Sequence, residues 1–256
     1  MAQNEASAAG SSKVSDGVSR SEDLGLSIFL GLMVFGLFLL IPGGPGEDGG
    51  PLMTTFLTLL FISATLTAVE RRGVRLLAVI LTVAAVSSHW ASVFMEDVAV
   101  ASARLLSAMA LLLVITVSLA VQTFRPGRVS SHRVRGAVAI YLLIGLIWAF
   151  AYAILDLHIP DAFTEAHSRH TADLLDLKEV VYFSFVTLTT VGYGDMAPRA
   201  PAIRSLAVLE ALLGQLYLAV TLARLVSMEL TERSLRRVGV CPTCGQEAET
   251  RAEAKP

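Results

Sequence analysis

Charged side chains are scarce in this sequence: Asp, Glu, Lys and Arg make up 16% of its 256 residues. Soluble domains carry about 25% charged residues, so this shortage argues against a soluble globular protein. Hydrophobic residues make up 54% of the chain. The formal net charge is -2. Because there is no excess of basic residues, the charge balance gives no reason to expect a nucleic-acid partner.

Cysteine is also rare, and the two cysteines, Cys241 and Cys244, lie close together. Two neighbouring cysteines exclude a disulfide scaffold. The Cys-Pro-Thr-Cys-Gly segment resembles half of a zinc knuckle, but zinc usually takes four ligands, so subunits would have to share the metal. A reduced pair in a cytoplasmic tail and a redox sensor are the alternatives. The sequence contains no catalytic triad, phosphate loop or complete metal site, so we expect neither an enzyme nor a cofactor.

Long hydrophobic runs are what the sequence has in abundance. Each is near the roughly 20 residues that a helix needs to cross a bilayer. Because backbone groups in lipid must be satisfied internally, we expect an all-α membrane protein with six transmembrane helices. The predicted helices are Leu24–Ile41, Leu52–Val69, Leu76–Phe94, Val98–Val121, Gly136–Leu155 and Pro201–Met228.

The polar segment Met1–Asp23 is rich in Ser, Ala and Gly, and we interpret it as a disordered tail. Because the first hydrophobic run follows this tail and lacks a small-residue cleavage site, we do not expect it to be a cleavable signal peptide.

The charges between the runs alternate in sign and predict the topology. Basic residues follow the second, fourth and sixth runs, and acidic residues follow the first and third. The positive-inside rule therefore predicts that both termini lie in the cytoplasm. We expect the membrane to be the plasma membrane. The basic residues are Arg71, Arg72, Arg75, Arg125, Arg128, Arg133, Arg135, Arg233, Arg236 and Arg237, and the acidic ones are Glu47, Asp48, Glu96 and Asp97.

The connector after the fifth run contains a second kind of helix. Asp156–Asp176 is long and polar, and Lys178–Thr189 is apolar but too short to span a membrane. A re-entrant helix surrounded by protein is the natural interpretation. Thr190-Val191-Gly192-Tyr193-Gly194 follows it directly, and Asp195 comes next.

This five-residue segment is suited to binding a dehydrated cation through backbone oxygens. Successive carbonyls can point to one axis only if the backbone alternates in hand, and Gly192 and Gly194 reach positive φ with little strain. The hydroxyl of Thr190 adds a further oxygen. An ordinary glycine turn is the alternative, but the position between a short helix and a spanning helix argues against it.

The segment Thr190–Asp195 resembles the selectivity filter of the tetrameric potassium channels. The resemblance implies a homotetramer in a lipid bilayer, with potassium as the permeant ion and Thr190, Val191, Gly192, Tyr193 and Gly194 as ion-binding residues. It also implies a pore domain over residues 136–230 and a four-helix, sensor-like domain over 24–122. A basic cytoplasmic linker at 123–135 would join them, and a cytoplasmic tail at 231–256 would follow.

Three residues are expected to support the filter. By resemblance, Tyr182 takes the place of a tryptophan that bonds the acid behind the filter, which is Asp195 here. The alternative is that Tyr182 only packs at an interface. Thr187 lies at the carboxyl end of the short helix, whose dipole directs partial negative charge toward a central cavity.

The last hydrophobic run is expected to line the pore. Gly214 matches the hinge glycine of the family, although it would also let helices pack closely. Leu218, Leu222 and Val226 recur every four residues and are predicted to form a hydrophobic gate. Glu210 is costly inside a membrane, and its partner is expected to be Ser184, Thr187 or cavity water.

A voltage sensor needs several basic residues within one spanning helix, and the fourth run contains Arg104 alone. We therefore do not expect strong voltage gating. His158, His167 and His170 are candidate pH sensors or ordinary surface histidines. A secondary transporter and a non-conducting channel subunit are the alternative functions, but transporters usually show internal repeats, and none is evident.

Overall fold

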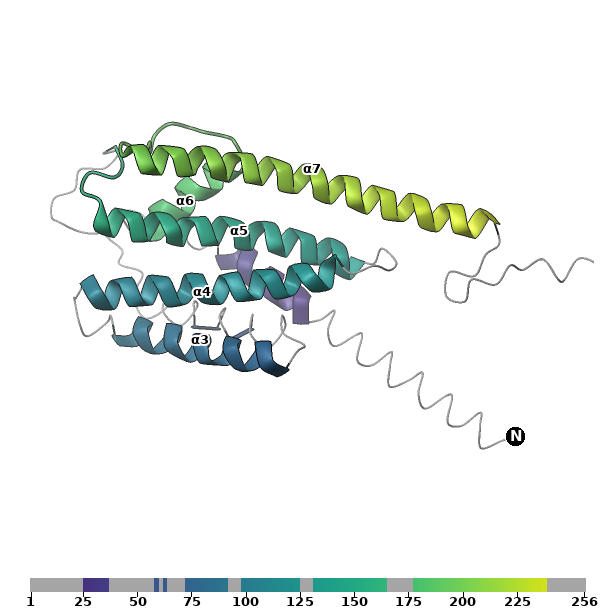
Figure 1. Cartoon of the computed structure of the whole chain (residues 1–256), viewed down its shortest axis with the longest axis horizontal. Helices are drawn as coiled ribbons and strands as arrows, with labels where there is room; N and C mark the ends of the chain where they lie inside the picture. Colours follow the sequence, from purple (N-terminus) through teal and green to yellow (C-terminus); the bar gives the residue numbers. More distant parts are fainter. Residues whose placement is uncertain are drawn as a thin grey trace, which may run out of the picture.

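The computed structural model describes residues 25–36, 58–59, 62–63, 72–91, 98–124, 131–164 and 177–238. They include a short helix, Gly25–Gly36, and the elements α3 (Arg72–Ala91), α4 (Val98–Thr123), α5 (Ser131–His158), α6 (Leu177–Leu188) and α7 (Pro201–Val238). Figure 1 shows the four long helices lying side by side, with the short α6 near α5 and α7. These residues are helical apart from their turns, loops and one isolated bridge, which agrees with the predicted all-α class.

Three helices are long and apolar enough to cross a membrane: Val98–Thr123, Arg133–His158 and Pro201–Leu230. They contain the whole of the fourth, fifth and sixth predicted spans. Gly25–Gly36 and Gly73–Ser88 are apolar but shorter. The second predicted span, Leu52–Val69, lies largely outside the described residues, as do the predicted tail at 1–23 and both cysteines. Six spans therefore remain a prediction.

Two helices begin earlier than the charge pattern predicts. α3 begins at Arg72, so Arg72 and Arg75 lie in its first turn rather than in a connector. α5 begins at Ser131, so Arg133 lies on a helix rather than in the predicted linker. Arginine is a good helix former, and neither helix start contains a proline that would delay it. Arg135 on α5 also donates a hydrogen bond to Ser27 Oγ on the first helix.

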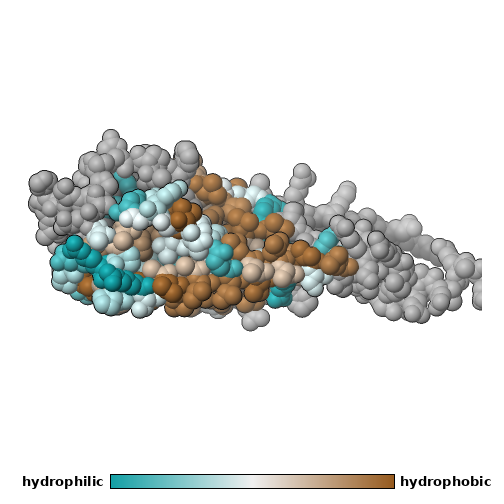
Figure 2. Space-filling model, turned by 90° about the horizontal axis from the view of Figure 1, so that it is seen from above, coloured by the Kyte–Doolittle hydropathy of each residue, from teal (hydrophilic) through white to brown (hydrophobic). Residues whose placement is uncertain are grey.

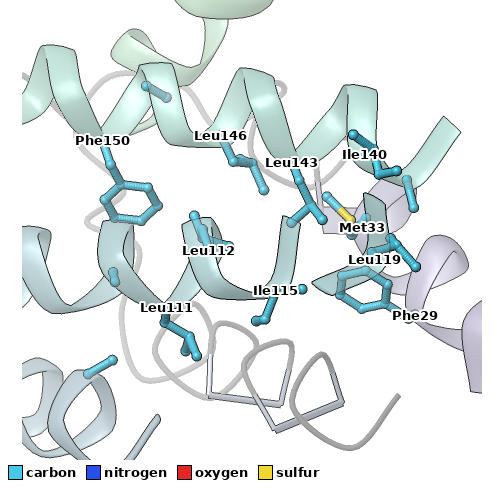
Figure 3. Close-up of a cluster of buried hydrophobic side chains, with 14 of the residues drawn as sticks. Phe29, Met33, Leu111, Leu112, Ile115, Leu119, Ile140, Leu143, Leu146 and Phe150 are labelled. Carbon is cyan, nitrogen blue, oxygen red and sulfur yellow. The ribbon is translucent and has the colours of Figure 1, made fainter. Parts of the chain in front are cut away.

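The main core lies where α4 packs between α3 and α5. Side chains of α4 and α5 gather in this core, and Phe29 and Met33 of Gly25–Gly36 join them, as Figure 3 shows. In a bilayer the surrounding lipid is as apolar as these side chains, so close packing rather than removal from water favours their association. The labelled core residues are Phe29, Met33, Leu111, Leu112, Ile115, Leu119, Ile140, Leu143, Leu146 and Phe150.

A second cluster holds α6 against its neighbours. The rings of Tyr152, Phe163 and Phe183 meet edge-on in all three pairs, with centroids 5.1 to 6.2 Å apart. Phe163 also pairs with Pro198 in an antiparallel bridge, and Thr164 N donates to Ala197 O at 2.7 Å. The chain leaving α5 is thereby tied to the chain that enters α7.

Gly214 lies at a close approach between α6 and α7. A Cβ at this position would lie 2.5 Å from Leu188 O and 2.8 Å from Leu188 Cδ1. α7 continues through Gly214 as one helix from Pro201 to Val238. The structure thus assigns Gly214 the packing role that was the alternative to a hinge, and a hinge function stays a prediction.

Much of the described surface is hydrophobic. Figure 2 shows brown residues along a large part of one face, with hydrophilic residues gathered toward one end. α7 contributes many exposed apolar side chains, including Leu212, Leu216, Val220 and Leu222. Apolar surface of this extent suits contact with lipid or with other protein.

The substitution Gly214→Ala tests the close contact between α6 and α7. Because the added methyl group would overlap a backbone oxygen, we expect it to destabilise the protein by about 1–3 kcal/mol. The measurement is the thermal unfolding midpoint in detergent. Gly31→Ala is the matched control, since nothing lies within 4 Å of a Cβ there. An unchanged midpoint in Gly214→Ala would contradict the packing role.

Candidate functional site

The segment after α6 has a backbone that alternates in hand. Thr190, Gly192 and Gly194 have φ angles of 59°, 59° and 81°, whereas Val191 and Tyr193 between them have no positive φ. The expected positive φ at Gly192 and Gly194 is confirmed. The same conformation at Thr190 was not predicted, because a β-branched residue with positive φ is an outlier that no sequence pattern signals.

Glycine is needed at these positions for conformation and not for space. A Cβ at Gly192 or Gly194 would have no heavy atom within 4 Å in the single chain. Thr190 accepts the strain that glycine avoids, which costs of order 1–3 kcal/mol. Its Oγ1 donates to Thr189 O at 2.7 Å and accepts from Gln215 Nε2 at 3.4 Å.

The amide groups of the segment turn back to the end of α6. Thr190 N donates to Thr187 O at 2.9 Å, and Val191 N donates to Val186 O at 2.9 Å. Gly192 N also approaches Val186 O, at 3.3 Å. These bonds satisfy carbonyl groups that a helix end leaves without partners. Thr187, predicted as a support, therefore contributes through its backbone.

Tyr182 on α6 bonds the acid that follows the segment. Its hydroxyl donates to Asp195 Oδ2 at 2.7 Å, and Met196 N donates to Asp195 Oδ1 at 2.9 Å. The hydrogen bond predicted between Tyr182 and Asp195 is thus present. This bond raises the pKa of Tyr182 to about 12, so the hydroxyl stays protonated near neutral pH. The ring also stacks on Tyr193, with centroids 6.5 Å apart.

Glu210 of α7 is fully buried, and its carboxyl group meets side chains of α5 and α6. Its Oε1 is hydrogen-bonded to Ser184 Oγ at 2.5 Å, which is one of the partners that the sequence allowed. Its Oε2 accepts from the Tyr152 hydroxyl at 2.7 Å. The sequence analysis did not predict the role of Tyr152. The available signal was a tyrosine within a hydrophobic run, since a buried tyrosine hydroxyl usually has a polar partner.

The predicted gate residues lie on exposed surface of α7. Leu218, Leu222 and Val226 are 45%, 66% and 50% exposed in the single chain. Leu216 and Val220 are equally exposed, so exposure does not single out one pore-lining face. The gate stays a prediction.

Two contacts join α7 to the helices before it. The Tyr217 hydroxyl donates to Ala137 O at 2.7 Å, and its ring stacks on Tyr141 with centroids 5.9 Å apart. Further along, Arg224 donates to Phe124 O and lies 5.1 Å above the Phe124 ring centroid. Neither contact was foreseen from the sequence.

The remaining candidates are mostly outside the described residues, which is where Cys241, Cys244, His167 and His170 lie. Within the described ranges, no group of three or more His, Cys, Asp or Glu residues could hold a metal ion. His158 is exposed, and its Nδ1 lies 2.8 Å from Ile154 O.

Comparison with known proteins is consistent with this geometry. Residues 140–230, which contain α6, the segment and most of α7, match a family described as ion channels. This match supports an ion-channel function, and the three helices that are long and apolar enough to cross a membrane agree with it.

Two relatives are similar to part of the chain. Two pore potassium channel a of Oryza sativa subsp. japonica is 33% identical over 103 residues, which is 40% of this chain and 26% of the relative. Protein LctB of Bacillus caldotenax is 38% identical over 87 residues, which is 34% of this chain and 64% of the relative. The chain thus spans less than two thirds of each relative. No solved structure matches.

The substitution Gly192→Ala tests the alternating backbone. A left-handed conformation costs an L-residue about 1–2 kcal/mol. We therefore expect ion flux through liposomes containing the variant to fall by about 5- to 30-fold. Gly73→Ala is the control, because that glycine has neither a positive φ nor a close neighbour. Normal flux in Gly192→Ala would show that the conformation at residue 192 does not matter.

Proposed function

We propose that the chain is one subunit of a homotetrameric, potassium-selective channel. The observation that carries the proposal is the alternating hand of the backbone at Thr190, Gly192 and Gly194, directly after a 12-residue helix. Alternation lets successive carbonyl oxygens of one segment line the same axis, where they replace the hydration shell of a potassium ion. The similarity of part of the chain to a two-pore potassium channel supports the same ion.

Several copies are needed because one chain offers a single such segment, and the resemblance to tetrameric potassium channels sets the number at four. A ring of oxygens around an ion requires several copies, and closed symmetry is the usual arrangement of identical subunits. Val191 and Tyr193 are 52% and 72% exposed in the single chain, as expected of side chains that await other subunits. The exposed apolar residues of α7 favour the same interpretation.

The proposed topology has six spans with both termini on the cytoplasmic side of the plasma membrane. α6, with 12 residues, is too short to cross a bilayer and would be re-entrant, with its carboxyl end facing the cavity. Leu218, Leu222 and Val226 would close the pore by excluding water. Cys241 and Cys244 remain a proposed half-site for shared zinc or a redox pair.

Strong voltage gating is not part of the proposal. Each charge that crosses the membrane field contributes about 2.3 kcal/mol per 100 mV, so steep gating needs several charges. α4 contains Arg104 as its one charged residue. We therefore propose conduction that depends weakly on voltage.

Flux from liposomes tests this function. We expect purified protein to pass potassium without a coupled ion, to be blocked by barium and to exclude sodium. A native mass measurement in detergent should give four copies. Coupled flux would instead indicate a transporter, and a lack of flux would indicate a non-conducting subunit. Equal passage of sodium and potassium, or a monomer, would overturn the proposal.

Tyr182→Phe tests the support of the outer mouth. Without the hydroxyl, Asp195 loses a hydrogen bond of about 1 kcal/mol, so we expect current during a sustained opening to decline roughly two- to tenfold faster. Tyr182→Trp is the matched variant, because its indole N–H can again donate to Asp195. Unchanged slow inactivation in Tyr182→Phe would remove the support role.

A further inference from the structure

A chain of hydrogen-bonding groups crosses from α5 through α7 and α6 and back to α5. Tyr152 bonds Glu210 Oε2 at 2.7 Å, and Glu210 Oε1 lies 2.5 Å from Ser184 Oγ. Ser184 Oγ also lies 2.7 Å from Gly145 O, a backbone carbonyl of α5. Ser184 and Glu210 are both fully buried. These hydrogen bonds link α5, α6 and α7.

Counting protons decides the charge of Glu210. Two oxygen–oxygen contacts meet at Ser184 Oγ, at 2.5 and 2.7 Å, and each is short enough to require a proton between its atoms. A serine hydroxyl has one proton, and a carbonyl oxygen has none to give. If Ser184 donates to Gly145 O, the proton of the 2.5 Å contact must come from Glu210.

The opposite arrangement leaves two acceptors in contact. An ionised Glu210 would take the Ser184 proton, and Ser184 Oγ would then face Gly145 O at 2.7 Å with no proton between them. It would also leave a buried carboxylate that is hydrogen-bonded to the hydroxyl groups of Tyr152 and Ser184 rather than to a cation. Burial of a charge without an opposite charge is costly, and the neutral acid avoids it.

We propose that Glu210 is a neutral carboxylic acid whose proton completes a directed chain from Tyr152 to Glu210, from Glu210 to Ser184 and from Ser184 to Gly145 O. These hydrogen bonds make Glu210 a positioning residue for α6. The consequence for conduction rests on the proposed channel function. The helix that Ser184 fixes also presents the Val186 carbonyl to the amides of Val191 and Gly192.

Deprotonation breaks this chain at one bond. When Glu210 loses its proton, Ser184 must donate either to the carboxylate or to Gly145 O, and the other contact becomes repulsive. α6 is then held less firmly against α5 or α7. Among the described residues, Tyr152 bonds the carboxyl and Tyr141 is close enough to feel its charge, and both are tyrosines of α5. Ser184, from α6, does not titrate in this range.

Infrared spectroscopy of the purified full chain tests the protonation state without reference to conduction. We expect a carbonyl stretching band of a protonated carboxylic acid at neutral pH, sensitive to D₂O and lost in Glu210→Gln. Tyr152→Phe should keep the band and shift its frequency, which assigns it even if Glu210→Gln does not fold. Glu229→Gln, on the same helix, is the control and should leave it unchanged. Absence of this band in the wild type would overturn the proposal.

Potassium flux tests the positioning role. The amide of Glu210→Gln can accept from Tyr152 and donate to Ser184, so we expect it to retain flux. Glu210→Leu and Ser184→Ala leave buried partners unsatisfied and should lose flux about tenfold. Ser205→Ala is the control, since Ser205 is exposed on α7 and bonds its own helix.

The pH profile separates positioning from general stability. Wild-type flux should fall at alkaline pH, and Glu210→Gln should not share this fall, because its amide does not titrate. A fall that persists in Glu210→Gln would belong to another titratable group and would overturn the role of Glu210. Equal loss of flux in Glu210→Gln and Glu210→Leu would overturn it too. If the wild type itself passes no potassium, the channel function fails, while the infrared result still decides the protonation state.

Discussion

The close contact between the end of α6 and α7 is the constraint on which the rest of the site depends. A Cβ on residue 214 would lie 2.5 Å from Leu188 O, so the backbones of the two helices are in close contact. The Tyr141 hydroxyl also reaches Leu188 O, at 3.4 Å, from α5. The amides of Thr190 and Val191 turn back to the same helix end. A displacement of α6 would therefore displace the segment whose backbone alternates in hand.

Polar side chains connect the helices in a part of the molecule where apolar side chains gain little from contacting protein rather than lipid. Between helices in lipid, close packing and hydrogen bonds decide which surfaces meet, because lipid is as apolar as leucine. Tyr152, Ser184 and Glu210 join three helices, and Tyr217 joins α7 to α5. Each of these groups finds a specific partner, which fixes the helices in one register.

The sequence was most informative where one residue type has one physical use. Glycine at 192 and 194 predicted positive φ, and an intramembrane carboxyl marked Glu210, with Ser184 among its candidate partners. Hydrophobic runs predicted α4 and α5 with small errors in their ends, whereas α7 continues to Val238, well beyond the predicted end at Met228. Partners from distant helices could not be predicted, because a hydroxyl such as that of Tyr152 carries no mark of what it will face. Thr190 was missed for a different reason: its conformation is imposed by neighbours against its own preference. The packing role of Gly214 needed coordinates, since a hinge and a close contact call for the same residue.

The contact of Arg224 with Phe124 has a mechanical consequence. Phe124 directly follows α4, and Arg224 holds both its carbonyl and its ring from a position on α7 beyond Gly214. The end of α4 is therefore joined to α7 at this level through one side chain. Because Arg224 lies further along α7 than Gly214, a shift of α4 along its axis would act on α7 at a point away from the segment that ends at Gly194.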